Sequence, residues 1–206
     1  MFYRFLPDTL NKSSLWMYKP AFEMSTIDNI VKALLPCEEQ LGKALVGGVQ
    51  SDESPGVLNE NLRRTGIYFI DYRESSFQNL FHTINSYSQN ANNSNFGFSL
   101  TYTEPLQYGV YKADSEDMYD WHCDQGAHRD KNNNVRKLSF SLLLSEPGVD
   151  FEGGEFEVME GADPYDAKLE KGTLVYFPSF LMHRVKPVTK GIRRSLVGWI
   201  NGPNWV

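Results

Sequence analysis

The sequence has little cysteine and no long apolar run. Cys37 and Cys123 are its only two cysteines, and two widely separated thiols do not form the disulfide framework of a small secreted protein. No stretch approaches the roughly 18 consecutive apolar residues of a membrane span, and Met1–Leu10 lacks the apolar core of a signal peptide. We therefore expect a cytoplasmic protein with reduced thiols and no membrane partner.

Clusters of basic residues are also missing. The chain has 20 Lys and Arg against 26 Asp and Glu, a formal net charge of -6. Without a basic patch, general DNA or RNA binding is excluded as the main function. The 206 residues, 41% hydrophobic and 14% aromatic, are enough to bury a full core. We expect a single domain, 1–206, while the oligomeric state is left open.

The two halves of the chain differ in their periodicity. Apolar residues at helical spacing predict helices near 25–35, where Ser25 is expected as the cap, and near 75–88. Asn90–Asn95 is expected to be a polar loop. After it, short apolar runs separated by turn residues predict strands, at 96–103, 106–111, 119–124, 138–144, 155–159, 172–177, 181–186 and 192–200.

Many short strands with turn signals favour an antiparallel sandwich or jelly roll. We therefore predict a mainly β fold with packed helices, a double-stranded β-helix of the cupin-like jelly-roll type. Residues 95–206 would form the jelly-roll core. Residues 1–94 would form a helical or mixed support region packed on one sheet.

The segment 119–124 carries the strongest chemical signal. His122 and Asp124 are two residues apart, so in a strand their side chains would share one face. An imidazole nitrogen and a carboxylate oxygen could then bind one metal ion. His183, near the start of a later predicted strand, could supply a third ligand. Two histidines and one carboxylate suit a non-haem Fe(II) oxygenase.

A second signal lies ten residues after His183. Arg193, Ser195 and Trp199 alternate onto one face of the predicted strand, and an arginine buried on that face needs an anionic partner. Its planar fork matches a carboxylate bidentately, and Ser195 could add a hydroxyl donor. The alternative is a structural ion pair with Glu155 or Glu157. Arg194 points to the other face and is interpreted as a solvated charge.

Taken together, these residues resemble a known family. The pattern His122-x-Asp124, His183, Arg193-x-Ser195 is similar to that of the Fe(II)/2-oxoglutarate-dependent oxygenases, in particular the prolyl-4-hydroxylase-like branch with its PKHD-type hydroxylases. The resemblance covers roughly residues 92–199.

The resemblance implies a function and a set of site residues. His122, Asp124 and His183 would be the catalytic iron ligands, and Arg193 would bind the distal carboxylate of 2-oxoglutarate. The predicted strand 138–144 has no tyrosine to assist Arg193, so Ser195 is taken as the substitute. Tyr111 and Tyr119 are candidates for the keto-acid end of the cosubstrate. The implied cofactors are Fe(II), 2-oxoglutarate and O2, with ascorbate as a candidate addition.

The substrate is less well defined by the sequence. The prolyl-hydroxylase resemblance, with polar connections at 48–61 and 125–135 that could close over an extended chain, favours a prolyl or other side chain in a peptide or protein. A free amino acid or another small molecule is the alternative. Two readings from other classes stay open: a zinc hydrolase, with His128 or Glu155 as general base, and a non-catalytic jelly-roll binding module.

Overall fold

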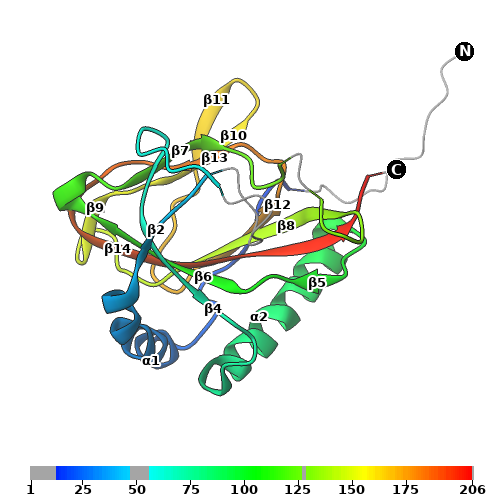
Figure 1. Cartoon of the computed structure of the whole chain (residues 1–206), viewed down its shortest axis with the longest axis horizontal. Coiled ribbons are helices and arrows are strands. Elements are labelled where there is room, and N and C mark those ends of the chain that lie inside the picture. The colour runs from blue at the N-terminus through cyan, green and yellow to red at the C-terminus, as the bar shows by residue number, and fades with distance from the viewer. Residues whose placement is uncertain (1–12, 47–55, 127–128, 206) are drawn as a thin grey trace, which may run out of the picture.

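The computed structural model describes residues 13–46, 56–126 and 129–205. Most of the polar connection at 48–61 and the candidate base His128 lie outside these ranges. Within the described ranges two antiparallel β-sheets lie face to face, and two helices cover the outside of the larger one (Figure 1).

The larger sheet is built around the long strand β14. Its hydrogen-bonded order is β1-β12-β8-β14-β6-β4-β2, and β5 and β9 also pair with β14. The strand bounds are β1 Trp16–Tyr18, β2 Gly42–Lys43, β4 Gly66–Ile70, β5 Tyr102–Thr103, β6 Leu106–Lys112, β8 Asn134–Leu143, β9 Phe151–Gly153, β12 Leu174–Pro178 and β14 Val188–Pro203.

The smaller sheet carries the metal-ligand candidates. Its order is β11-β10-β13-β7-β3, and β7 and β13 lie next to each other in antiparallel register with His122 opposite His183. The strand bounds are β3 Arg63–Arg64, β7 Met118–His122, β10 Phe156–Glu160, β11 Asp163–Asp166 and β13 His183–Val185.

The two faces of the larger sheet contact different layers. On the outer face, Leu138, Phe140 and Leu196 pack against apolar residues of α1 (Met24–Leu34) and α2 (Gln78–Ala91). On the inner face, a second cluster fills the space between the sheets with side chains such as Tyr111, Leu143 and Phe156. This arrangement follows from the period-two alternation of β8 and β14, and it confirms the predicted jelly roll with packed helices.

The N-terminal part of the chain does more than support the core. Its strands β1, β2 and β4 extend the larger sheet, and β3 extends the smaller one. It stays a prediction that the chain is one domain with a support region at 1–94 and a jelly-roll core at 95–206. None of the helices in the described ranges is long and apolar enough to cross a bilayer.

Several local expectations were wrong. Glu23, not Ser25, precedes α1, and it provides no side-chain cap. The expected polar loop at 90–95 is helical instead, because α2 runs to Ala91 and a π-helical turn, η3 (Asn92–Phe96), follows. The Asn92 side chain stabilises this turn by accepting a hydrogen bond from the Phe98 backbone N–H and donating one to the Phe98 carbonyl.

Candidate metal centre and anion pocket

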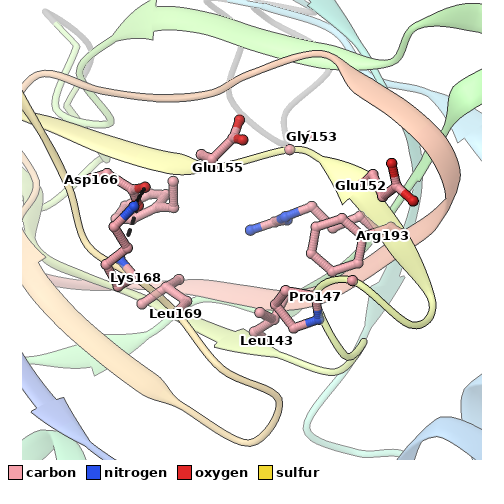
Figure 2. Close-up of a pocket in the computed structure, with 13 residues that line it drawn as sticks. Leu143, Pro147, Glu152, Gly153, Glu155, Asp166, Lys168, Leu169 and Arg193 are labelled. Carbon is pink, nitrogen blue, oxygen red and sulfur yellow. Dashed lines mark hydrogen bonds and ion pairs between the residues drawn. The ribbon is translucent and has the colours of Figure 1, made fainter.

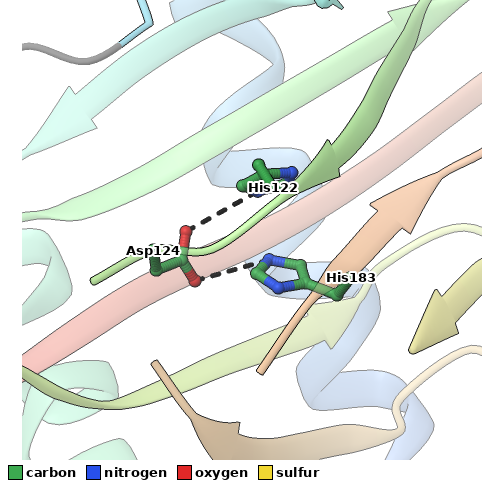
Figure 3. Close-up of side chains that lie close together, drawn as sticks. All are labelled: His122, Asp124 and His183. Carbon is green, nitrogen blue, oxygen red and sulfur yellow. Dashed lines mark ion pairs between the residues drawn. The ribbon is translucent and has the colours of Figure 1, made fainter. Parts of the chain in front are cut away.

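Three side chains that could bind one metal ion meet between β7 and β13. His122 is the last residue of β7, His183 is the first of β13, and Asp124 follows β7 in the turn. Asp124 Oδ1 lies 3.7 Å from His122 Nε2, and Asp124 Oδ2 lies 3.5 Å from His183 Nε2. Figure 3 shows both imidazoles facing the carboxylate. One ligand atom from each residue lies within 4.8 Å of the others, close enough for a shared ion.

The prediction that His122 and Asp124 share one face of a continuous strand was wrong, because β7 ends at His122. The turn after the strand, rather than strand alternation, brings the Asp124 carboxylate back toward the imidazole.

Backbone hydrogen bonds orient both imidazoles. His122 Nδ1 lies 2.7 Å from the Asp120 carbonyl oxygen, and His183 Nδ1 lies 2.8 Å from the Leu181 carbonyl oxygen. A carbonyl can only accept, so each Nδ1 carries the proton and each Nε2 keeps its lone pair. Bonds of this kind fix the tautomer and orientation of metal-binding histidines.

The charge states also suit a cation. Burial, followed by the neighbouring His183, lowers the pKa of His122 to about 3, so this imidazole is neutral near pH 7. Burial acts to raise the pKa of Asp124, but His183, His122 and Arg136 more than offset it, and the net pKa is lowered. Two imidazoles and an ionised carboxylate are the donor set of non-haem Fe(II) sites, so the residues present fit this metal.

Tyr119 supports the cluster from one side. Its ring stacks on the His122 imidazole with centroids 3.4 Å apart and an interplanar angle of 10°. The Arg63 guanidinium lies over the other side of this stack, 4.4 Å from the Tyr119 centroid, and donates a hydrogen bond of 2.6 Å to Gln107. Burial is the main cause that raises the pKa of Tyr119 to about 12, so the phenol stays neutral.

Arg193 occupies a separate pocket between the sheets. The pocket has a volume of about 340 Å³, and its lining includes Leu143, Phe151, Gly154 and Phe156. Figure 2 shows the Arg193 guanidinium projecting into a space bordered by Leu143, Glu155 and Lys168. Although Arg193 is only 1% exposed, its Nε has no hydrogen-bond partner. Burial lowers the pKa of Arg193, with Tyr111 acting in the opposite direction, but an arginine remains charged in proteins.

No carboxylate of the described ranges neutralises this charge. Of the two expected alternatives, Glu155 pairs with Lys186 at 3.4 Å and Glu157 pairs with Arg184 at 2.7 Å. An uncompensated charge is costly in the interior. The pocket therefore fits an anionic ligand, and a carboxylate matches the guanidinium fork.

Ser195 and Tyr111 lie beside the guanidinium. Arg193 Nη1 donates to Ser195 Oγ at 3.2 Å, which leaves the hydroxyl proton available for another acceptor. Tyr111 lies opposite Arg193 in the β6–β14 pairing, and the guanidinium carbon is 5.4 Å from its ring centroid. Gly154, with a φ of +63°, makes room for the arginine, because a Cβ there would come within 2.8 Å of Arg193 Cδ.

The pocket and the metal-ligand cluster share a wall. His122, Asp124 and His183 are not among the pocket lining, but Phe156 is, and its ring centroid lies 5.7 Å from that of His183. Phe156 therefore borders both the Arg193 pocket and the metal-ligand cluster.

Two arginines near the site were not expected from the sequence. Arg63 belongs to a segment with no motif, and Arg136 lies in the polar stretch before the predicted strand 138–144. A register shift between β8 and β14 brings Arg136 opposite Asn201 and places its guanidinium 3.8 Å from the Trp199 centroid. Glu104 binds Arg136 bidentately, at 2.8 and 2.6 Å.

Comparisons with known proteins agree with this geometry. Residues 106–201 match the model of the 2OG-Fe(II) oxygenase superfamily. Among curated relatives, a PKHD-type hydroxylase of Parvibaculum lavamentivorans is 54% identical over 63 residues, which are 31% of this chain and 28% of the relative. A PKHD-type hydroxylase of a Picosynechococcus species is 46% identical over 85 residues, 39% of this chain and 37% of the relative. The matched parts thus span about a third of these relatives.

Solved structures resemble the chain over nearly its whole length. A prolyl-4-hydroxylase of Pseudomonas putida has a TM-score of 0.71 at 20% identity and covers 93% of this chain and 94% of its own. A Trichoplax adhaerens prolyl hydroxylase in complex with a peptide fragment of the hypoxia inducible factor oxygen degradation domain has a TM-score of 0.71 at 17% identity, with 94% and 86% covered. At these identities the likeness establishes the jelly-roll fold.

Proposed function

We propose, from the match of residues 106–201 to the model of the 2OG-Fe(II) oxygenase superfamily, that this chain is an Fe(II)- and 2-oxoglutarate-dependent dioxygenase. It would hydroxylate a C–H bond of a prolyl or other side chain in a peptide or protein. The observation that carries the proposal is the pairing of two features in one interior: a His122–Asp124–His183 cluster and a buried Arg193 without a carboxylate partner. One feature suits iron, and the other suits a dicarboxylic acid.

Each residue has a defined part in this reaction. His122, Asp124 and His183 would hold Fe(II) through two imidazole nitrogens and a carboxylate oxygen. The bound metal would supply the oxidative chemistry by which O2 gives one oxygen atom to succinate, formed from 2-oxoglutarate with release of carbon dioxide, and the other to the substrate as a hydroxyl group. Arg193 would bind the distal carboxylate with Ser195 as a second donor, and Tyr111 would contact the cosubstrate near its keto-acid end.

For Tyr119 we propose a part that differs from the predicted one. It was predicted as a second candidate for the keto-acid end, and its stacking on His122 at 3.4 Å supports a role in orienting that imidazole instead. We keep cosubstrate contact by its hydroxyl as the alternative for this residue.

A peptide or protein is the favoured substrate. The relatives are PKHD-type hydroxylases, and one protein of the same fold is described in complex with a peptide fragment. Trp199, on the inner face with Arg193, is held by Arg136 and could contact a substrate beside the metal. A free amino acid or small molecule is the second candidate.

The two other classes have less support. A zinc hydrolase needs a general base at the metal. Glu155 instead lines the Arg193 pocket and pairs with Lys186, and His128 lies outside the described ranges. A binding module without catalysis gives the converging His122, Asp124 and His183 no role.

Mass spectrometry of peptides tests the proposal. Proline-containing peptides and free amino acids are incubated with the protein, Fe(II), ascorbate and 2-oxoglutarate, and succinate is measured in parallel. We expect a peptide to gain one oxygen on proline and succinate to form in equal amount. Turnover of free amino acids alone would overturn the peptide assignment, and absence of 2-oxoglutarate-dependent oxidation of every substrate would overturn the dioxygenase.

A further inference from the structure

Three aromatic side chains form a row beside the candidate metal centre. Trp205, which follows β14, lies between Phe98 and Phe180, with ring centroids 5.2 and 5.8 Å away and interplanar angles of 83° and 68°. We call Phe98, Trp205 and Phe180 the aromatic row. Phe180 is 52% exposed and Trp205 is 42% exposed, so large apolar rings face solvent, which often marks an interaction site.

Hydrogen bonds join this row to the turn that carries Asp124. Cys123 Sγ donates to the Phe180 carbonyl at 3.1 Å, and the Gln125 backbone N–H donates to the Ser179 carbonyl at 2.8 Å. Trp205 Nε1 donates to Gln125 Oε1 at 3.1 Å. Because Cys123 and Gln125 flank Asp124, the row is hydrogen-bonded to both chain neighbours of a predicted metal ligand.

The middle ring of the row is held in place. Lys137 Nζ lies 3.2 Å from the Trp205 ring centroid, and Lys137 forms no ion pair with any residue in the described ranges. A cation over an indole face is attracted by the ring quadrupole. This contact and the bond to Gln125 fix the indole, so a ligand would meet a preformed surface and lose little entropy in ordering it.

We propose that the aromatic row binds the part of a peptide substrate that flanks the prolyl residue held at the metal, and that this flanking part is itself rich in proline. This inference rests on the proposed function and deepens it. A peptide whose reacting residue lies at the metal must leave the site over neighbouring surface, advancing about 3.1 Å per residue in the polyproline II conformation. The aromatic row adjoins the ligand-bearing turn on such a path.

Proline-rich chains match this surface better than other extended chains. Polyproline II segments dock into aromatic-lined grooves, since their rings fit between aromatic rings and their ordering cost is small. The row presents aromatic rings of this kind to solvent, because Phe180 is 52% exposed and Trp205 is 42% exposed. The carbonyl groups of a polyproline II segment have no internal hydrogen bonds. The Gln125 side-chain NH2 group, whose amide oxygen accepts the bond from Trp205, is a donor at the same place.

Binding without turnover is the first test. The full chain is loaded with Fe(II) and 2-oxoglutarate under argon, and a fluorescein-labelled proline-rich peptide is titrated by anisotropy. We expect Trp205→Ala and Phe180→Ala each to raise Kd at least about fivefold, as for a binding hot spot. Tyr165→Ala is the matched control, because Tyr165 is 48% exposed but lies on β11, and it should leave Kd unchanged. Thermal unfolding verifies that each variant is folded. Equal Kd values for the wild type and both row variants would overturn the proposal.

Kinetics separate this inference from the proposed reaction. If the row binds the flanking part, Trp205→Ala should raise KM for a long proline-rich peptide at least about fivefold with kcat unchanged. For a tripeptide that contains the target proline, the same substitution should leave both KM and kcat unchanged. Hydroxylation of the long peptide with equal KM in both proteins would overturn the row and leave the reaction intact. Tight, Trp205-dependent binding of the peptide without its hydroxylation would overturn the proposed reaction and leave the peptide-binding role of the row intact. Dimers in sedimentation that Trp205→Ala dissociates, with peptide affinity unchanged, would assign the row to a second copy of the chain.

Discussion

At the level of single residues, the proposed metal binding should depend on two Nε2 atoms whose orientation is fixed by backbone carbonyls. Replacing His183 by Ala removes one of three ligands together with its bond to the Leu181 carbonyl. We expect His183→Ala to lose bound iron and all 2-oxoglutarate-dependent turnover, with iron measured by inductively coupled plasma mass spectrometry. His82→Ala is the control, because His82 is exposed on α2. Wild-type iron content in His183→Ala would refute the assignment of this ligand.

Arg193 is the residue on which cosubstrate binding should depend. Loss of a buried charge-assisted pair costs about 2–5 kcal/mol, so Arg193→Ala should raise the 2-oxoglutarate concentration for half-maximal rate at least tenfold. Arg193→Lys should be intermediate, since an ammonium lacks the bidentate fork. Lys190→Ala is a matched control on the same strand, because Lys190 is exposed and pairs with Glu152. An unchanged requirement in Arg193→Ala would move the anchor to another residue.

The site residues that belong to a sequence motif could be predicted, whereas those that reach the site only through contacts with distant parts of the chain could not. His122, Asp124, His183 and Arg193 could be selected because their types and spacing belong to a known chemistry. Arg63 could not, because its place over Tyr119 depends on β3 pairing with a strand more than fifty positions later in the chain. Stacking between distant side chains leaves no local pattern.

At the level of elements, β14 has one face toward the pocket between the sheets and the other toward the helices. As the alternation predicted, Arg193 and Ser195 share its inner face, where Arg193 lines the pocket and donates a hydrogen bond to Ser195. Its outer face was misread at Arg194, which was interpreted as a solvated charge. Arg194 Nε instead donates to Glu38 Oε1 at 2.7 Å, and the Tyr108 hydroxyl donates to the same carboxylate at 2.7 Å. Period-two alternation gives the face of a strand but not the element that covers it, here η1 (Leu35–Gln40).

The Glu38–Arg194 ion pair, whose side chains are largely shielded from solvent, supports a stability prediction. Glu38→Ala removes the shared acceptor and leaves the Arg194 and Tyr108 donors unpaired, so the free energy of unfolding should fall by about 1–3 kcal/mol. Urea denaturation measures the change. Glu60→Ala is the control, because its pair with Lys43 is exposed and surface pairs contribute little. Equal effects of the two substitutions would contradict a structural role for Glu38.

At the level of the whole molecule, the jelly roll brings together two candidate sites, the metal-ligand cluster and the Arg193 pocket. The smaller sheet contributes His122 and His183 through the β7–β13 pairing, while the larger sheet contributes Arg193 through β14. The alternation of short strands predicted this class of fold well. It could not give the pairing order, because β2, β3, β9 and β11 are too short or too polar to produce a pattern. Nor could it give the π-helical turn η3, which depends on bonds between Asn92 and Phe98.

Oxygen labelling tests the central claim of a 2-oxoglutarate-dependent dioxygenase most directly. The full chain is incubated with Fe(II), 2-oxoglutarate, a proline-rich peptide and O2 enriched in oxygen-18, and both products are analysed by mass spectrometry. We predict one labelled atom in the hydroxyl group of the peptide and one in succinate, in equal amounts, and neither product with Arg193→Ala at low 2-oxoglutarate. A hydroxylated peptide that carries only oxygen from water, or a modified peptide formed without succinate, would contradict the account.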